Sequence, residues 1–304
     1  MTTCLTVRAS RRLNSLVPQP RFGASLGRNG VNLGDRTVLV GGGCYALGGS
    51  ASFVAGNLCY IAGAGSGNVA LGTSSWVNGV CVGSIAIGNS CAISGIVNSA
   101  IAIGHVAVAT HSYTLSSGVS CATGNSYQWI IGNGATASQQ NAMSRGVFTY
   151  PTRYGEDGWS SGRHTTNGDV MSSTLTVGGT TTNATPTELF IGCAASNRIV
   201  LTAGSSLLVD IRAVARTTGA INKTAVFRRS LQIDRPTNAA STTLVGAVQT
   251  LLTDTGSNAG TPPAGWALTL SADTTNGSLK VEATGDTDTI LWSIEVTFQQ
   301  AVRA

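Results

Sequence analysis

The feature that most constrains the fold is a long stretch without charge. Residues 37–144 contain no Asp, Glu, Lys or Arg, and nineteen glycines lie between Gly41 and Gly134. Such a segment stays soluble if small polar side chains face water while apolar ones stack inside. A solenoid of short strands and tight turns meets this demand, because Gly and Asn accept the positive φ values of tight turns. We therefore expect a β-solenoid.

A repeat supports this expectation. The tetrapeptides VALG (69–72), IAIG (85–88) and IAIG (101–104) recur every 16 residues, each followed by a second short strand. The segments YALG (45–48) and IIG (130–132) look like degenerate copies of the same tetrapeptide. A fixed period of this size indicates stacked turns with equivalent positions one above the other. We expect Ile87 and Ile103 to point inward, with Ala86 and Ala102 on the opposite side.

Composition narrows the class further. Charged residues make up 10% of the chain, against about 25% in ordinary soluble domains. No run of 18 apolar residues occurs, and residues 1–12 lack the order of a signal peptide. Good helix formers are sparse, whereas Gly, Thr, Ser and Val are abundant. These features predict an all-β protein and no membrane insertion.

The excess positive charge lies in one arm. Residues 1–36 contain six arginines, against Asp35 alone, whereas residues 145–304 balance to zero. Such a basic arm is expected to bind an acidic surface of a partner. Phe22 is its one aromatic residue, so base stacking and nucleic-acid binding have little support. We expect residues 1–40 to dock on a partner, with the arginines that carry the contact being Arg8, Arg11, Arg12 and Arg21.

The remaining chain divides in two. Charged and aromatic residues crowd residues 145–175 together with proline and glycine, which predicts a neck after a shaft of residues 41–144. Residues 176–304 alternate polar and apolar side chains between turn signals. We expect a β-sandwich, jelly-roll-like, with strands near 170–177, 187–191, 198–202, 206–217, 224–234, 242–249, 265–272, 278–284 and 289–301.

Two resemblances follow from these residues. The units NVALGTSSWVNG (68–79) and SIAIGNSCAISG (84–95) resemble head repeats of trimeric autotransporter adhesins, which implies a trimeric β-roll. From about residue 150 to 302, phrases such as VDIRAVARTTG (209–219) and LQIDRPTNAASTTLVG (231–246) resemble the C-terminal domain of bacteriophage tail fibre proteins.

The tail fibre resemblance implies a function. It implies a homotrimeric virion protein, assembled in the host cytoplasm, whose arm docks on other virion proteins. Its C-terminal domain (residues 176–304), here called the knob, would adsorb to a glycan or protein of the host surface by multivalent binding. The alternatives are a head fibre or capsid decoration and, in another class, a tailspike that degrades polysaccharide.

Residues that could carry chemistry point to binding and not to catalysis. Glycan cleavage needs two carboxylates about 5–10 Å apart, and the shaft contains none. The tight pairs are Glu156 with Asp157, whose side chains should point to opposite faces, and Asp286 with Asp288. A groove between subunits using Glu156 or Asp169 remains the one catalytic route, so we expect no enzyme.

The cysteines and histidines predict neither a cofactor nor a metal site. The seven cysteines form no CxxC pair, which favours structural thiols over disulfides or metal ligands. In a trimer, His105 or His111 could meet its two copies at the axis. Whether the three side chains bind an ion there is left open.

The tryptophans and tyrosines divide into core and surface. Trp266 and Trp292 lie in alternating strands and are expected in the core. The candidate receptor-binding residues are Tyr150, Tyr154 and Trp159, which lie in irregular sequence.

Overall fold

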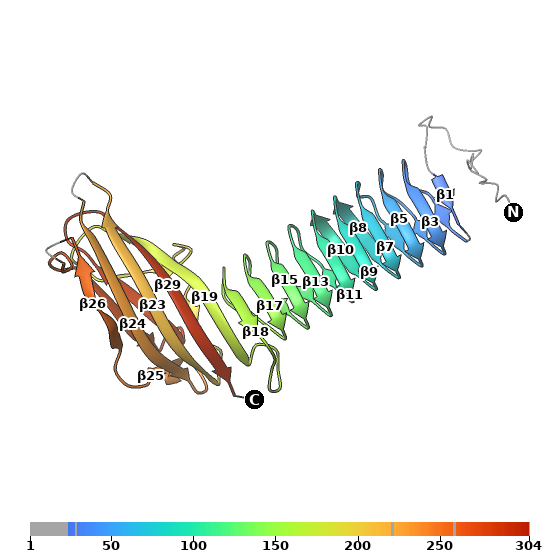
Figure 1. The fold of residues 1–304 in the computed structure, drawn as a ribbon. Coiled ribbons are helices and arrows are strands. Elements are labelled where there is room, and N and C mark those ends of the chain that lie inside the picture. Colours follow the sequence, from blue (N-terminus) through green and yellow to red (C-terminus); the bar gives the residue numbers. More distant parts are fainter. Residues whose placement is uncertain (1–23, 28, 220–221, 258–259, 304) are drawn as a thin grey trace. The chain divides into compact units, whose positions relative to one another are not determined.

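A computed structural model describes residues 24–27, 29–219, 222–257 and 260–303 of the chain. The described chain is nearly all β and contains a β-solenoid of about nine turns. The chain divides into two compact units, residues 1–137 and 138–304 (Figure 1). No helix of the described residues is long and apolar enough to cross a membrane.

The first unit is built from two parallel ladders, and each solenoid turn adds one strand to each ladder. Ladder A consists of β1 (Ala24–Leu26), β3 (Val38–Gly42), β5 (Phe53–Asn57), β7 (Val69–Thr73), β9 (Ile85–Asn89), β11 (Ile101–His105), β13 (Leu115–Val119) and β15 (Trp129–Asn133). Ladder B consists of β2 (Val31–Asn32), β4 (Tyr45–Ala46), β6 (Tyr60–Ala62), β8 (Trp76–Val82), β10 (Ala92–Asn98), β12 (Val108–Ala109), β14 (Ala122–Thr123) and β16 (Thr136–Ala137).

The register of ladder A follows the repeat. Ile87 pairs with Leu71 on one side and with Ile103 on the other, so equivalent positions do stack as the period predicts. The partner of Ile101 is Leu115, fourteen residues on, and the shorter turn explains why the repeat slips there. The segment at Ile130 is a true copy of the tetrapeptide, since Ile130 pairs with Ser116.

Two expectations about the repeat are wrong. Tyr45 and Ala46 belong to ladder B, and the ladder A copy in that turn is β3. The facing of the repeat is also reversed, because Ala86 and Ala102 are fully buried while Ile103 is 39% exposed and Ile87 is partly exposed. The inward column that contains Ala86 and Ala102 holds mostly small residues, although Leu39, Val54 and Ile130 occupy equivalent positions and are buried too. Alternation correctly separates the two faces but does not say which is inside.

Glycine closes the ladder A strands. Gly88 has a φ of +136°, and a Cβ built on it would lie 1.9 Å from the carbonyl oxygen of Gly104 in the next turn. Gly104 stands in the same relation to Gly118. The fourth position of the repeat is therefore glycine for two reasons, the left-handed backbone and the close approach of the next turn.

The second unit begins with two more parallel strands and continues as antiparallel sheets. Its elements are β17 (Met143–Val147), β18 (Asp157–Ser160), β19 (Val170–Thr181), β20 (Thr187–Glu188), β21 (Phe190–Ile191), β22 (Ile199–Val200), β23 (Ser205–Thr217), β24 (Thr224–Arg235), the 3-10 helix η1 (Ala239–Ser241), β25 (Thr243–Leu244), β26 (Gln249–Gly256), β27 (Ala267–Asp273), β28 (Ser278–Thr284) and β29 (Ile290–Val302). The expected neck thus contains β17 and β18, which pair in parallel.

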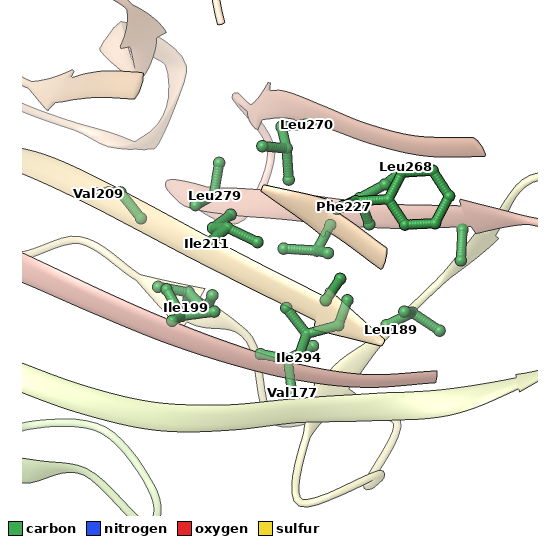
Figure 2. Close-up of a cluster of buried hydrophobic side chains, with 14 of the residues drawn as sticks. Val177, Leu189, Ile199, Val209, Ile211, Phe227, Leu268, Leu270, Leu279 and Ile294 are labelled. Carbon is green, nitrogen blue, oxygen red and sulfur yellow. The ribbon is translucent and has the colours of Figure 1, made fainter. Parts of the chain in front are cut away.

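One core holds the second unit together. The larger sheet pairs β19 with β29, β29 with β23, and β23 with β24, all antiparallel, while β28 joins β20, β22 and β27 in a smaller sheet. Both sheets contribute to a single cluster of buried hydrophobic residues. Figure 2 shows side chains of this cluster, among them Leu270 from the smaller sheet and Ile294 from the larger. Two packed sheets around one core agree with a sandwich, and the jelly-roll topology stays a prediction.

Most of the expected strands of this unit are present within a residue or two. The exception is the expected strand 242–249, where the chain forms only the short β25, and β26 starts at Gln249 instead. All but two residues of β26 are exposed, so its sequence carries little alternation to reveal it. Trp266 and Trp292 lie in the core as expected.

Candidate binding surfaces

The outer face of ladder A presents two stacked columns of side chains that are apolar except for Ser117. Val38, Phe53 and Trp129 are 36%, 39% and 54% exposed in the first column, and Ile103 and Ile131 are 39% and 42% exposed in the second. The first column consists of Val38, Phe53, Val69, Ile85, Ile101, Leu115 and Trp129. The second consists of Val40, Ala55, Leu71, Ile87, Ile103, Ser117 and Ile131.

This outer face is largely apolar over many turns of the solenoid. Single exposed apolar residues need no explanation, but a contiguous apolar stripe marks a site that another surface covers. No charged side chain interrupts it, since residues 37–144 have none. Alternation alone does not reveal this stripe, because it predicts Ile87 and Ile103 inside when both are at least partly exposed.

The expected receptor residues have three different surroundings. Tyr150 is 36% exposed, and Trp159 on β18 is 53% exposed. Tyr154 packs against the core of the second unit, and its hydroxyl hydrogen-bonds to the side-chain amide of Asn141. Trp159 and Tyr150 are thus exposed, whereas Tyr154 packs against the core. Arg8, Arg11, Arg12 and Arg21 lie outside the described residues.

Glu156 belongs to a buried network of hydrogen bonds and one ion pair. Its carboxylate accepts hydrogen bonds from the backbone N–H groups of Thr152 and Arg153 at 2.9 Å, and from the Arg153 guanidinium at 3.0 Å. The same guanidinium donates to the Val200 carbonyl at 2.8 Å and to the Gln300 side chain at 3.2 Å, and it lies over the Phe298 ring. Both charges are buried, so this network joins the segment before β18 to β22 and β29.

The Asp169 carboxylate is likewise held by hydrogen bonds. It is buried and accepts hydrogen bonds from the backbone N–H groups of His164, Thr165 and Thr166. Burial opposes ionisation, but these hydrogen bonds outweigh it and lower the pKa of Asp169 to about 2. Glu156 and Asp169 are thus both buried and held by hydrogen bonds within the chain.

The other acidic pairs are also bound in ion pairs. Asp157 points away from Glu156, as expected from strand geometry, and pairs with Arg145. Asp286 and Asp288 both accept from the Lys223 ammonium group, at 2.9 and 2.7 Å. Each pair is therefore part of a local structural contact.

The thiols of the first unit have structural roles. Cys91 donates a hydrogen bond from Sγ to the Gly104 carbonyl of the next turn at 3.1 Å, and Cys59 does the same to Gly72 at 3.2 Å. Ser75, in the intervening turn, makes the equivalent bond with its hydroxyl to Gly88 at 2.9 Å. Burial raises the pKa of the Cys91 and Cys59 thiols, which keeps them protonated and unreactive.

The expectation of free thiols is confirmed for the six described cysteines, and Cys4 lies outside the described residues. Across the part of the chain that the structure describes, no three His, Cys, Asp or Glu side chains gather as a metal site. His105 is exposed at the end of β11, and His111 shares a 2.9 Å hydrogen bond with the Thr110 hydroxyl.

Comparison with known proteins shows only distant likeness. No protein-family model and no curated protein matches the chain. Among solved structures, the tailspike protein of Acinetobacter baumannii phage AM24 is 9% identical with a TM-score of 0.27, covering 90% of this chain and 54% of that one. The tailspike protein gp49 of Acinetobacter baumannii bacteriophage Fri1, a capsular polysaccharide depolymerase, is 7% identical with a TM-score of 0.26, covering 89% and 69%. The chain therefore spans about half the length of the first of these, and scores this low carry no argument here.

Proposed function

We propose that this chain is a homotrimeric bacteriophage virion fibre, a tail appendage that adsorbs to the surface of the host bacterium. The observation that carries the proposal is the apolar, uncharged outer face of ladder A. A shaft with such a face needs a partner along its whole length, and a second and third copy of the same shaft supply one. The sequence resemblance to tail fibre C-terminal domains supplies the biological setting.

Self-association fits the outer face for a geometric reason. The face repeats at every turn, because Ile85, Ile101 and their equivalents stack in register. In a parallel assembly around one axis, each turn of one copy meets the same turn of the others, so the match extends over the whole ladder. The absence of charge between residues 37 and 144 removes like-charge repulsion from such an interface.

The proposal divides the work along the chain. The expected boundary at residue 40 is wrong for the described chain, because β1 and β2 already belong to the ladders. The virion-docking arm is therefore the segment before β1, the shaft continues from β1 to residue 144, residues 145–175 are the neck, and residues 176–304 form the receptor-binding knob. Trp159 and Tyr150 are the receptor candidates with exposed rings. Three copies in one fibre, and several fibres in one particle, convert a weak contact into strong attachment through effective concentration.

A depolymerase would need a free carboxylate pair. In this sequence, Asp35 is followed by no further acidic residue until Glu156. Glu156 and Asp169 are both occupied by buried hydrogen bonds. These observations favour an adhesive fibre over a polysaccharide-degrading tailspike.

The test measures mass and attachment together. Light scattering should give about three times the chain mass of 30.8 kDa, and the labelled protein should bind cells of a host strain. Deletion of residues 1–23, which precede β1, should leave the trimer and its cell binding intact but prevent incorporation into virions. A monomer at micromolar concentration, or normal incorporation of the truncated chain, would contradict the proposal. Release of reducing ends from host polysaccharide would favour the tailspike instead.

A further inference from the structure

Two exposed tyrosines form a stacked pair on the solenoid. The rings of Tyr113 and Tyr127 lie with their centroids 5.1 Å apart and their planes 11° from parallel. The two residues are 52% and 55% exposed, so about half of each remains open to a ligand. Neither residue belongs to a strand or to the outer face of ladder A.

The backbone at both positions is unusual for tyrosine. Tyr113 and Tyr127 have φ values of 57° and 58°, in the left-handed region. Their N–H groups donate to the carbonyls of Asn98 and Ser112, one turn back, at 2.9 and 3.2 Å. The same turn occurs earlier in the solenoid, where the equivalent residues are Ala51, Gly67, Gly83 and Ser99.

Small residues are the expected occupants of this turn. The left-handed conformation brings Cβ close to the following carbonyl oxygen, so side chains other than Gly and Asn disfavour it. A tyrosine there gains little in return from burial, because its ring projects into solvent. Left-handed backbone alone does not single out the two tyrosines, because the exposed Leu58 and Val106 have it too. What distinguishes this turn is that two consecutive copies hold aromatic rings that stack on each other.

We infer that Tyr113 and Tyr127 form a binding platform for a neutral polysaccharide of the host surface, an inference that rests on the proposed function. A tyrosine ring offers a rigid apolar face for the C–H groups of a sugar and a hydroxyl for hydrogen bonding. Residues 37–144 contain no Asp, Glu, Lys or Arg, so apart from His111, two residues before Tyr113, no acidic or basic side chain lies near the rings in sequence, which favours an uncharged ligand. Two polar residues lie near the rings. The exposed Asn98 accepts the hydrogen bond from the Tyr113 N–H group, and the partly exposed Ser126 directly precedes Tyr127 in sequence.

A second copy of the chain is the other conceivable occupant, and the repeat argues against it. A self-association face recurs at every turn, as the columns of ladder A do. The ring pair is confined to two turns, while the equivalent residues Gly67, Gly83 and Ser99 present no ring. A local feature of this kind suits a ligand that is bound at one place on the shaft.

The experiment replaces both rings by the residue that an equivalent turn already uses. The variant Tyr113→Ser with Tyr127→Ser should fold and keep its oligomeric state, because Ser99 takes the same φ. The probe is the purified surface polysaccharide of a strain that the full-length chain binds. We expect the double variant to bind this polysaccharide at least tenfold more weakly than the unaltered chain. The control variant Tyr45→Ser, which removes an exposed ring elsewhere, should bind it with unchanged affinity.

A second readout is local to the site. Bound polysaccharide should protect Tyr113 and Tyr127 from nitration, measured by mass spectrometry, while Tyr45 stays reactive. Unchanged affinity of the double variant, or equal nitration with and without polysaccharide, would overturn the platform. If instead the unaltered chain binds no host cells, the proposed function fails; if the double variant binds cells as well as the unaltered chain, only the platform fails.

Discussion

Placing a carboxylate inside the solenoid tests which face of the repeat is the interior. The substitution is Ala86→Asp. Ala86 is fully buried and stacks between Ala70 and Ala102, which are also fully buried. Residues 37–144 contain no Lys or Arg that could pair with the new carboxylate.

The expected loss of stability has two parts. Enlarging a side chain in a packed interior costs about 1–3 kcal/mol. An unpaired polar group buried there costs about 1–3 kcal/mol even if the carboxyl stays protonated, and ionisation would add several kcal/mol. The change should therefore remove at least about 2–6 kcal/mol from a total of about 5–15 kcal/mol.

Two neighbouring substitutions serve as controls, with unfolding by denaturant followed by circular dichroism for all three variants. Asn89→Asp at an exposed position should change the free energy of unfolding by about 0.5 kcal/mol or less. Ile87→Asp should leave the solenoid folded but dissociate the proposed trimer, as seen by light scattering, since Ile87 lies on the outer face. Equal unfolding midpoints for Ala86→Asp and Asn89→Asp would refute the assignment of the interior.

Four further changes probe individual contacts, all measured by denaturant unfolding. Gly88→Ala should cost at least about 1–3 kcal/mol, because of its left-handed backbone and the 1.9 Å approach to the Gly104 carbonyl, whereas Gly162→Ala, with open space around it, should be tolerated. Glu156→Gln should cost about 3–5 kcal/mol by leaving the Arg153 charge uncompensated, against at most about 1 kcal/mol for Asp157→Asn in the exposed pair with Arg145. Because its folded-state pKa is lowered from 3.8 to about 2, Asp169 should contribute about 2 kcal/mol above pH 3.8 and lose it as the pH falls through 2, a dependence that Asp169→Asn would abolish. Cys91→Ser should be nearly neutral, since Ser75 makes the same hydrogen bond one turn away, and a large loss of stability would contradict the thiol's role as a carbonyl donor.

Local pattern predicts much of this fold because strands and turns have local signatures. The alternation in LLVDIRAVART (207–217) correctly predicts β23, and the repeat period correctly predicts how β7, β9 and β11 stack. β26 escapes prediction because nearly all its residues are exposed and no period of two remains.

The candidate binding surfaces were less accessible to sequence reasoning. Tyr113 and Tyr127 lie in different turns, and only the stacking of those turns brings their rings together. Glu156 and Asp169 look like candidate acids in the sequence, yet their partners include backbone N–H groups, which no residue pattern reveals.

The sequence by itself determined the all-β class, the stacked period and the uncharged shaft, because these depend on the order and kind of residues alone. Only the tertiary structure decided that Ala86 faces inward and Ile87 outward. The physical reason is that alternation separates two faces without saying which one is inside. The facing is set by the register of each strand against its ladder partners, and a shift of one residue would exchange the faces. The column of Ala86 therefore buries Leu39, Val54 and Ile130 as well, while the isoleucines of the other face stay partly exposed.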